Sequence, residues 1–300
     1  MAALAVTLHL QQQQVIQGAA GAPCYPALFI FGDSLSDTGN GNLTGSPLFT
    51  RTAQRPYGET VPGFPFGRFS DGLLLVDFLA TWIGLPLSNP YLDKGADFTT
   101  GVNYAVSSAT AQNAFYLRSR LVTPLTNLSL DVQIGWHLAL KASKSSSHNP
   151  STHAYSKGLY VLEIGGNDYI DALNSLIYSP SYITNYFVPQ VMAKIRNATK
   201  VLYTHGARNF LYISINPLGC APSLLSLRPL GTKDSNGCLQ ALNTLSYAHG
   251  AELLSLVNDL RATYPKLRFT FVDYYNAYLK VIENNLSYGK HPLLFVLRVF

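Results

Sequence analysis

A serine flanked by acidic and glycine residues follows a short apolar run near the start of the chain. The run Leu28–Phe31 ends at Gly32, and Asp33 and Ser34 come directly after it. A short apolar run that ends in glycine predicts a buried strand entering a tight turn. We expect Ser34 to lie in the first turn of a helix, where free backbone N–H groups and the helix dipole favour negative charge. The residues are compatible with a plain polar loop, and equally with a nucleophile whose oxyanion is stabilised.

Two further groups of polar residues follow predicted strands in the same way. Ser107 and Ser108 follow an apolar segment that ends at residue 106, and Asn167 and Asp168 follow another through two glycines. In a parallel sheet the site lies beyond the carboxyl ends of the strands, so we expect these groups and Ser34 to meet at one edge. A tetrahedral oxyanion needs two or three fixed hydrogen-bond donors, which this edge would supply. Asn167 is also compatible with a simple turn residue.

Strands and long helices alternate along the chain and would position these groups. Strands are expected at 28–31, 101–106, 158–164, 209–215 and 267–272, and helices at 73–83, 129–144, 182–203 and 239–264. Apolar strands separated by long helices predict an α/β fold with a parallel sheet covered on both faces. Ser70 or Asp71 is expected to cap the first of these helices, and residues 145–157 are expected to form an exposed polar loop. Since no repeat or linker divides the chain, one domain is expected.

Composition and charge exclude several classes of function. Of the 300 residues, 47% are hydrophobic and 12% are charged, which predicts a folded chain with a core. The net charge is +5, but the basic residues are scattered without interleaved aromatics, so no nucleic-acid partner is expected. The sequence contains neither an apolar stretch long enough to span a bilayer nor cysteines and histidines with metal-ligand spacing. We therefore expect no integral membrane segment, no metal and no cofactor.

The N-terminal segment and several sequons favour secretion. Residues 1–22 contain a short apolar segment and an Ala-Ala-Gly-Ala stretch typical of a signal-peptide cleavage site, but no basic residue precedes them. We interpret this segment as a degenerate signal peptide. Asn-X-Ser/Thr sequons, the acceptors of N-linked glycans, stand at Asn42, Asn127, Asn197 and Asn285. An extracellular glycoprotein is therefore expected.

The three cysteines are compatible with an oxidising compartment. Cys220 and Cys238 bracket a loop rich in glycine, proline, serine and asparagine, which a disulfide could close. Cys24 is left over. It is either a free thiol or a cysteine whose partner is missing from these residues.

Several segments of the chain resemble conserved blocks of the GDSL esterase/lipase family within the SGNH hydrolases. They follow one another along the chain in the same order as those blocks. Together they are specific, although each alone would be weak evidence. The resemblance covers residues from about 23 to 288 and is typical of the plant branch, including its sinapine- and acetylajmalan-esterase-like members. The matching segments are 31–40, which reads Phe-Gly-Asp-Ser-Leu-Ser-Asp-Thr-Gly-Asn, together with 56–58, 67–72, 101–105, 165–168 and 271–275.

The resemblance implies a flavodoxin-like three-layer α/β/α sandwich with a parallel sheet. It also implies hydrolysis of a small-molecule ester or lipid through an acyl-enzyme, by a monomer without a cofactor. Ser34 matches the family's nucleophile. The oxyanion hole would consist of the Ser34 N–H, an N–H of the second block at Ser108, and the side chain of Asn167.

Two features depart from the family's pattern. The second block has Ser108 where the family has glycine. We expect the N–H of Ser108 to remain an oxyanion donor only if the turn does not need a positive φ. The hydroxyl of Ser108 would also crowd the acyl group. The family's last block, Asp-X-X-His, supplies the base and its orienting acid. None of the seven histidines here has an aspartate three residues before it. His205 and His249 are the nearest candidates for a substitute, and a structural role is expected for both.

The resemblance therefore predicts an incomplete hydrolase domain at 23–289, followed by a tail at 290–300 that does not resemble the family. Because a serine without a base is a poor nucleophile, we expect the esterase to be weak or inactive. One alternative is a non-catalytic protein that binds esters or glycosides, and another is a chain that does not fold stably. A third is a flavin-binding protein in which residues 36–40 cradle a phosphate, although Asp33 and Asp37 would repel it.

Overall fold

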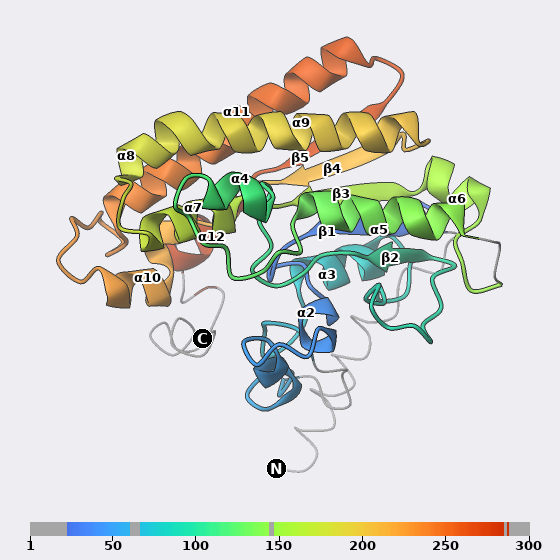
Figure 1. Cartoon of the computed structure of the whole chain (residues 1–300), viewed down its shortest axis with the longest axis horizontal. Helices are drawn as coiled ribbons and strands as arrows, with labels where there is room; N and C mark the ends of the chain where they lie inside the picture. Colours follow the sequence, from blue (N-terminus) through green and yellow to red (C-terminus); the bar gives the residue numbers. More distant parts are fainter. Residues whose placement is uncertain (1–22, 61–66, 144–146, 285–286, 288–300) are drawn as a thin grey trace.

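Five parallel strands form one sheet in the order β2-β1-β3-β4-β5 (Figure 1). The computed structural model describes residues 23–60, 67–143, 147–284 and 287. The predicted α/β fold with a parallel sheet is confirmed, and each strand lies in or within one residue of its predicted range. The strands are β1 (Leu28–Gly32), β2 (Gly101–Asn103), β3 (Leu159–Glu163), β4 (Asn209–Ile213) and β5 (Arg268–Val272).

Some sequence predictions concern residues outside the described ranges. They are the signal peptide at 1–22, the tail at 290–300 and the sequon at Asn285.

Helices cover both faces of the sheet. Their bounds are α2 Asn40–Leu43, α3 Leu75–Trp82, α4 Ala114–Arg118, α5 Leu130–Ala142, α6 Thr152–Lys157, α7 Gly166–Asn174, α8 Pro180–Tyr182, α9 Val188–Thr204, α10 Pro222–Leu227, α11 Gln240–Thr263 and α12 Tyr274–Glu283. The described residues also form short 3-10 turns at Thr50–Ala53 and Leu218–Cys220 and a π-helical turn at Ile183–Phe187. None of the described helices combines the length and apolar character needed to cross a membrane.

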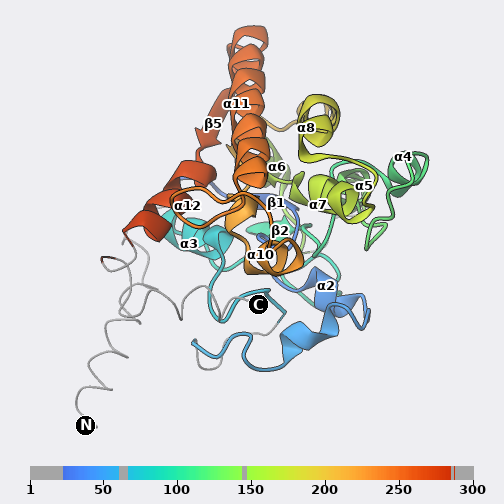
Figure 2. The same ribbon diagram turned by 90° about the vertical axis from the view of Figure 1, so that its left-hand side faces the viewer.

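Alternating residues of β1 belong to two separate hydrophobic clusters. Leu28 and Ile30 pack with Val76 and other residues on the side of α3. Phe29 and Phe31 belong to the larger cluster, which also contains buried residues of α5, α7, α9 and α11. Figure 2 shows α3 and α12 on one side of the sheet and α5 and α7 on the other. Burial on both faces explains why the central strands are continuously apolar, and the architecture is the three-layer sandwich expected from the resemblance.

Three details of the helices differ from the predictions. Neither Ser70 nor Asp71 caps α3; instead, the carboxylate of Asp77 in its own first turn accepts a hydrogen bond from Leu74 N at 2.9 Å. Residues 152–157, expected in an exposed loop, form α6, because the hydroxyl of Ser151 accepts from Ala154 N and the apolar side of the turn is buried. The helix expected at 182–203 is interrupted by the π-helical turn that precedes α9.

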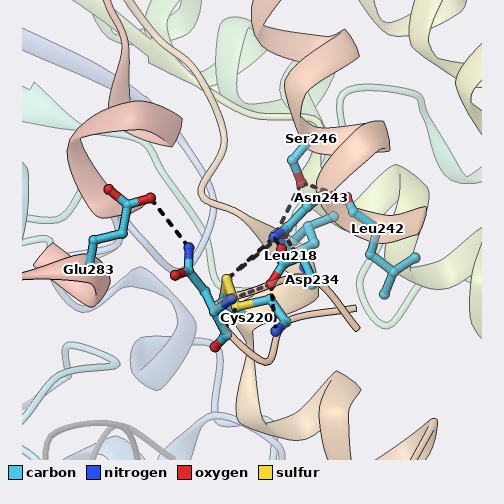
Figure 3. Close-up of a disulfide and its surroundings, with 10 residues drawn as sticks. Leu218, Cys220, Asp234, Leu242, Asn243, Ser246 and Glu283 are labelled. Carbon is cyan, nitrogen blue, oxygen red and sulfur yellow. Dashed lines mark hydrogen bonds between the residues drawn. A yellow bond between two sulfur atoms is a disulfide. The ribbon is translucent and has the colours of Figure 1, made fainter. Parts of the chain in front are cut away.

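The predicted disulfide joins Cys220 to Cys238, while Cys24 is free and exposed. Figure 3 shows Asn243 and Ser246 of α11 next to the residues of this loop. Asn243 accepts a hydrogen bond from Gly219 N at 3.0 Å and donates one to Asp234 at 2.9 Å. This loop is therefore held covalently by the disulfide and by hydrogen bonds to α11.

His137 of α5 lies in an aromatic cluster within the core. Its ring makes edge contacts, at centroid distances of 5.3 to 5.6 Å, with Phe29, Phe31, Tyr104, Tyr155 and Tyr160. No described residue makes a hydrogen bond to its Nδ1. Burial lowers the pKa of His137 from 6.5 to about 3, so the imidazole is neutral in the folded protein.

Acidification is expected to destabilise the protein through His137. Between pH 6.5 and about 3 the unfolded chain binds more protons at this residue than the folded one, so its stabilising effect is complete above pH 6.5 and is lost as the pH falls. The loss is ~2 kcal/mol at about pH 5. In urea denaturation, His137→Phe should lose correspondingly less unfolding free energy between about pH 8 and pH 5.

The exposed His153 provides the matched control, since His153→Phe should follow the parent protein at both pH values. Asp168 and Asp171, whose pKa burial raises to about 7, act with the opposite sign, but they are the same in all three proteins. An acid-induced loss in His137→Phe equal to that of the parent would contradict the prediction.

Candidate active site

Ser34 lies in a turn immediately after β1. The turn is closed by a hydrogen bond from Ser36 N to Asp33 O at 3.1 Å, and the carboxylate of Asp33 accepts another from Leu35 N at 3.1 Å. Ser34 is partly exposed, and no described residue makes a hydrogen bond to its hydroxyl or accepts one from its backbone N–H. Its N–H and Oγ therefore both remain available to a ligand.

The prediction that Ser34 lies in the first turn of a helix is wrong, because α2 begins only at Asn40. The aspartates of the loop account for the difference. Asp33 bonds to the backbone N–H of Leu35, and Asp37 bonds to those of Gly39 and Gly41 at 2.8 Å each. Aspartate side chains that capture nearby N–H groups favour turns over helices.

Asp37 also connects the Ser34 loop to the segment after β2. Its fully buried carboxylate accepts hydrogen bonds from the backbone N–H of Ser107 at 2.7 Å and from its hydroxyl at 2.8 Å. Burial raises the pKa of Asp37, and its hydrogen bonds partly offset that shift. One side chain thus fixes the residue that precedes Ser108.

Ser108 adopts a backbone conformation that favours glycine. It is the third residue of a turn closed by a hydrogen bond from Ala109 N to Val106 O, and its φ is +61°. The turn therefore has the positive φ that the glycine of the family's block suggested. The serine itself adopts this conformation, and no described residue accepts a hydrogen bond from its N–H.

Replacing Ser108 by glycine is expected to stabilise the protein by about 0.5–1 kcal/mol. A left-handed conformation costs a non-glycine residue ~1–2 kcal/mol, and the greater freedom of glycine in the unfolded chain offsets part of that gain. The urea midpoint of Ser108→Gly should rise with an unchanged slope. Ser107→Gly, which loses a hydrogen bond to Asp37, should lower the midpoint. A Ser108→Gly midpoint at or below that of the parent would contradict the expected strain.

Asn167 is the second residue of α7, directly after β3. Gly165 makes this connection possible: its φ is +120°, and a Cβ there would lie 2.8 Å from Val191 and 3.1 Å from His249. The side-chain amide of Asn167 donates to Asp33 Oδ2 at 3.1 Å and to Ala109 O at 3.0 Å. Hence the structure brings the segments of Ser34, Ser108 and Asn167 together at the carboxyl edge of the sheet.

Asp168 and Glu163 are two buried acids near this edge. The sequence predicted the position of Asp168, whereas it gave no role to Glu163. Asp168 accepts hydrogen bonds from the backbone N–H groups of Ala111 at 2.7 Å and Gln112 at 2.9 Å, which holds the far side of the Ser108 segment. Glu163, the last residue of β3, accepts a hydrogen bond from the hydroxyl of Ser36 at 3.2 Å. A charged residue inside an otherwise apolar strand was the signal that could have indicated Glu163.

The described histidines do not make a hydrogen bond to Ser34. His249 is fully buried, and its Nδ1 lies 2.8 Å from the hydroxyl of Tyr169. Burial lowers the pKa of His249 to about 3. His205 is exposed at the end of α9, where its Nδ1 lies 2.8 Å from Val201 O. These positions agree with the structural roles expected for both residues.

Comparison with known proteins identifies a family and several relatives. The model of the family "GDSL-like Lipase/Acylhydrolase" matches residues 28–292. Over 270 residues the chain is 37% identical to acetylajmalan esterase 2 of Rauvolfia serpentina, an alignment covering 88% of this chain and 74% of the relative. It is 34% identical over 284 residues to GDSL esterase/lipase At1g28600 of Arabidopsis thaliana (92% and 71% covered) and 35% identical over 277 residues to At5g45910 of that plant (88% and 74%).

Proposed function

The chain belongs to the GDSL-like lipase/acylhydrolase family and is thus a serine ester hydrolase, and we propose that Ser34 is the nucleophile that forms its acyl-enzyme. The observation that supports this role most directly is the set of donors around the serine. The backbone N–H groups of Ser34 and Ser108 have no acceptor among the described residues, and the Asn167 amide is tied to both segments. Three such donors at one edge suit the oxyanion of a tetrahedral intermediate.

The reaction would proceed in two steps. The hydroxyl oxygen of Ser34 attacks the carbonyl carbon of a small-molecule ester, its proton leaves with the alcohol, and water then hydrolyses the acyl-serine. Both donor positions of the Asn167 amide are occupied by Asp33 and Ala109 in the free protein. An incoming oxyanion must therefore replace one of these acceptors, and the second keeps the amide in place.

We propose that this 300-residue chain hydrolyses esters slowly. None of its seven histidines follows an aspartate at the spacing of the family's base block, and His137 and His249 are buried and engaged elsewhere. Without a base, a serine hydrolase retains only ~10³–10⁴-fold catalysis over water, from binding and the oxyanion hole.

We also propose that the protein is secreted and carries N-linked glycans. The Cys220–Cys238 disulfide supports an oxidising compartment, where such bonds persist. Asn127 and Asn197 are exposed, so glycans on them would lie on the surface. A lipid substrate and a monomeric state also remain proposals.

The test is turnover of p-nitrophenyl acetate and butyrate by the purified chain and by Ser34→Ala. We expect the parent to hydrolyse these esters slowly and Ser34→Ala to show only the uncatalysed rate. Equal rates for the two proteins would refute the role of Ser34. Turnover as fast as that of a relative with an Asp-X-X-His block, and dependent on Ser34, would refute the absence of a base. Ester-induced thermal stabilisation in both proteins without turnover would instead favour a non-catalytic binding protein.

A further inference from the structure

Two buried carboxyl groups lie side by side behind the proposed oxyanion hole. Gly32 of β1 pairs with Glu163 of β3, and Asp33 is the next residue along the chain. Asp33 and Glu163 are 3% and 2% exposed, and their side chains hydrogen-bond to each other. Two carboxyl groups can form such a bond only when one of them holds a proton.

The pair is connected directly to the proposed site. Asp33 accepts hydrogen bonds from Leu35 N, the residue after Ser34, and from the amide of Asn167. Glu163 accepts one from the Ser36 hydroxyl through Oε2, and no N–H or hydroxyl group of the described residues donates to its Oε1. A continuous chain of contacts therefore runs from Glu163 through Asp33 to Asn167.

The surroundings disfavour a second negative charge on the pair. Burial raises the pKa of Asp33 to about 7 and that of Glu163 well above its usual value. The titratable groups that face the pair are Asp37 of the same loop, which raises the pKa of Asp33, and Tyr274 at the start of α12, which faces Glu163. From α11, the neutral imidazole of His249 lies 3.1 Å from where a Cβ on the adjoining Gly165 would be.

We propose that Glu163 is a positioning residue that shares one proton with Asp33 and thereby holds the Asn167 amide at the oxyanion hole. The shared proton limits the pair to a single negative charge. A second charge would repel the first, displace Asp33 from Asn167 and oppose the oxyanion that develops next to it. This inference rests on the function proposed above, since it assigns a role to groups behind the same oxyanion hole.

Two substitutions at Glu163 separate positioning from mere packing. Glu163→Gln keeps the shape, a donor towards Asp33 and an acceptor for Ser36, whereas Glu163→Ala removes all contacts. We expect Glu163→Ala to lower kcat for p-nitrophenyl acetate roughly 10-fold with little change in KM, a fraction of the effect of losing a whole oxyanion donor. Glu163→Gln should restore kcat, and it should lack the decline in kcat that we expect for the parent at the alkaline end of the pH profile.

Two spectroscopic measurements do not depend on turnover. The infrared band of a protonated carboxyl group should persist in the parent at about pH 8 and should be absent from Glu163→Gln. This pH lies above the pKa of about 7 of Asp168 and Asp171, so these two acids should contribute little to the band. The NMR resonances of the Asn167 side-chain amide should shift in Glu163→Ala and return in Glu163→Gln. Asp171→Asn, which removes another buried acid of α7, is the matched control and should leave the band and the Asn167 resonances in place.

Some results would overturn the inference. One is an infrared band at pH 8 that survives in Glu163→Gln, and another is an Asn167 resonance that does not respond to Glu163→Ala. Failure of Glu163→Gln to recover either kcat or the resonance would also refute it. If Ser34→Ala leaves hydrolysis unchanged, the proposed nucleophile fails, but the infrared and NMR results still decide whether Glu163 positions Asn167.

Discussion

Asn167→Ala is expected to lower kcat for ester hydrolysis about 100- to 1,000-fold, which is the usual cost of removing one oxyanion donor. The effect should fall on kcat rather than KM, because the amide interacts with charge that develops only in the transition state. The same substitution also breaks the hydrogen bonds to Asp33 and Ala109, which hold the segments of Ser34 and Ser108 together. The measurement is turnover of p-nitrophenyl acetate, from which the rate of Ser34→Ala is subtracted as the background.

Asn174→Ala is the matched control for this prediction. Asn174 is an exposed residue at the end of the same helix, α7, and its replacement should leave kcat unchanged. Circular dichroism of the two variants would verify that α7 remains folded. A kcat for Asn167→Ala within a factor of about 3 of the parent would exclude the amide as an oxyanion donor.

Arg68→Met is expected to lower the free energy of unfolding by about 3–5 kcal/mol. Arg68 forms two hydrogen bonds of 2.8 Å with the carboxylate of Asp77, and the two side chains are only 4% and 1% exposed. Arg68 also donates to Thr38 O at 3.3 Å, which ties the loop before α3 to the Ser34 loop. Removing the guanidinium leaves a carboxylate buried without its partner, and that accounts for most of the loss.

Urea denaturation tests this prediction with two comparisons. The double variant Arg68→Met/Asp77→Asn should recover a substantial part of the loss, because no isolated charge remains buried. The ion pair between Arg196 and Asp259 has the same 2.8 Å separation, but its side chains are 47% and 59% exposed. Arg196→Met should therefore cost less than about 1 kcal/mol. Similar losses for Arg68→Met and Arg196→Met would show that burial of the pair is unimportant.

The sheet could be predicted from the sequence because each strand is a local signal. An apolar run such as Leu28–Phe31, ended by a glycine, needs no knowledge of its neighbours. The direction of the strands then places Ser34, Ser108 and Asn167 at one edge. The turn at Ser34 could not be predicted as reliably, because the side chains of Asp33 and Asp37 compete locally with the helix that the pattern suggests.

The supports of the site were beyond prediction for a different reason. The hydrogen bonds from Ser107 to Asp37 and from Asn167 to Ala109 join residues 70 and 58 positions apart. Nothing in either segment alone specifies the partner. Likewise, α6 was missed because its polar composition resembles a loop, while the burial of Ala154 and Tyr155 that stabilises it appears only in the folded chain.

The position of β1 between β2 and β3 has a consequence for biosynthesis. Leu28 pairs with Gly101 on one side and with Leu159 on the other, so one edge of this apolar strand lacks its partner for 131 further residues (159 − 28). At ~5–20 residues per second, a ribosome needs about 7–26 s to add them. The strand that precedes Ser34, the proposed nucleophile, is thus the first one made, and it is enclosed on both sides only when β3 has been added. Throughout that interval the nascent chain exposes an aggregation-prone edge that a chaperone would have to shield.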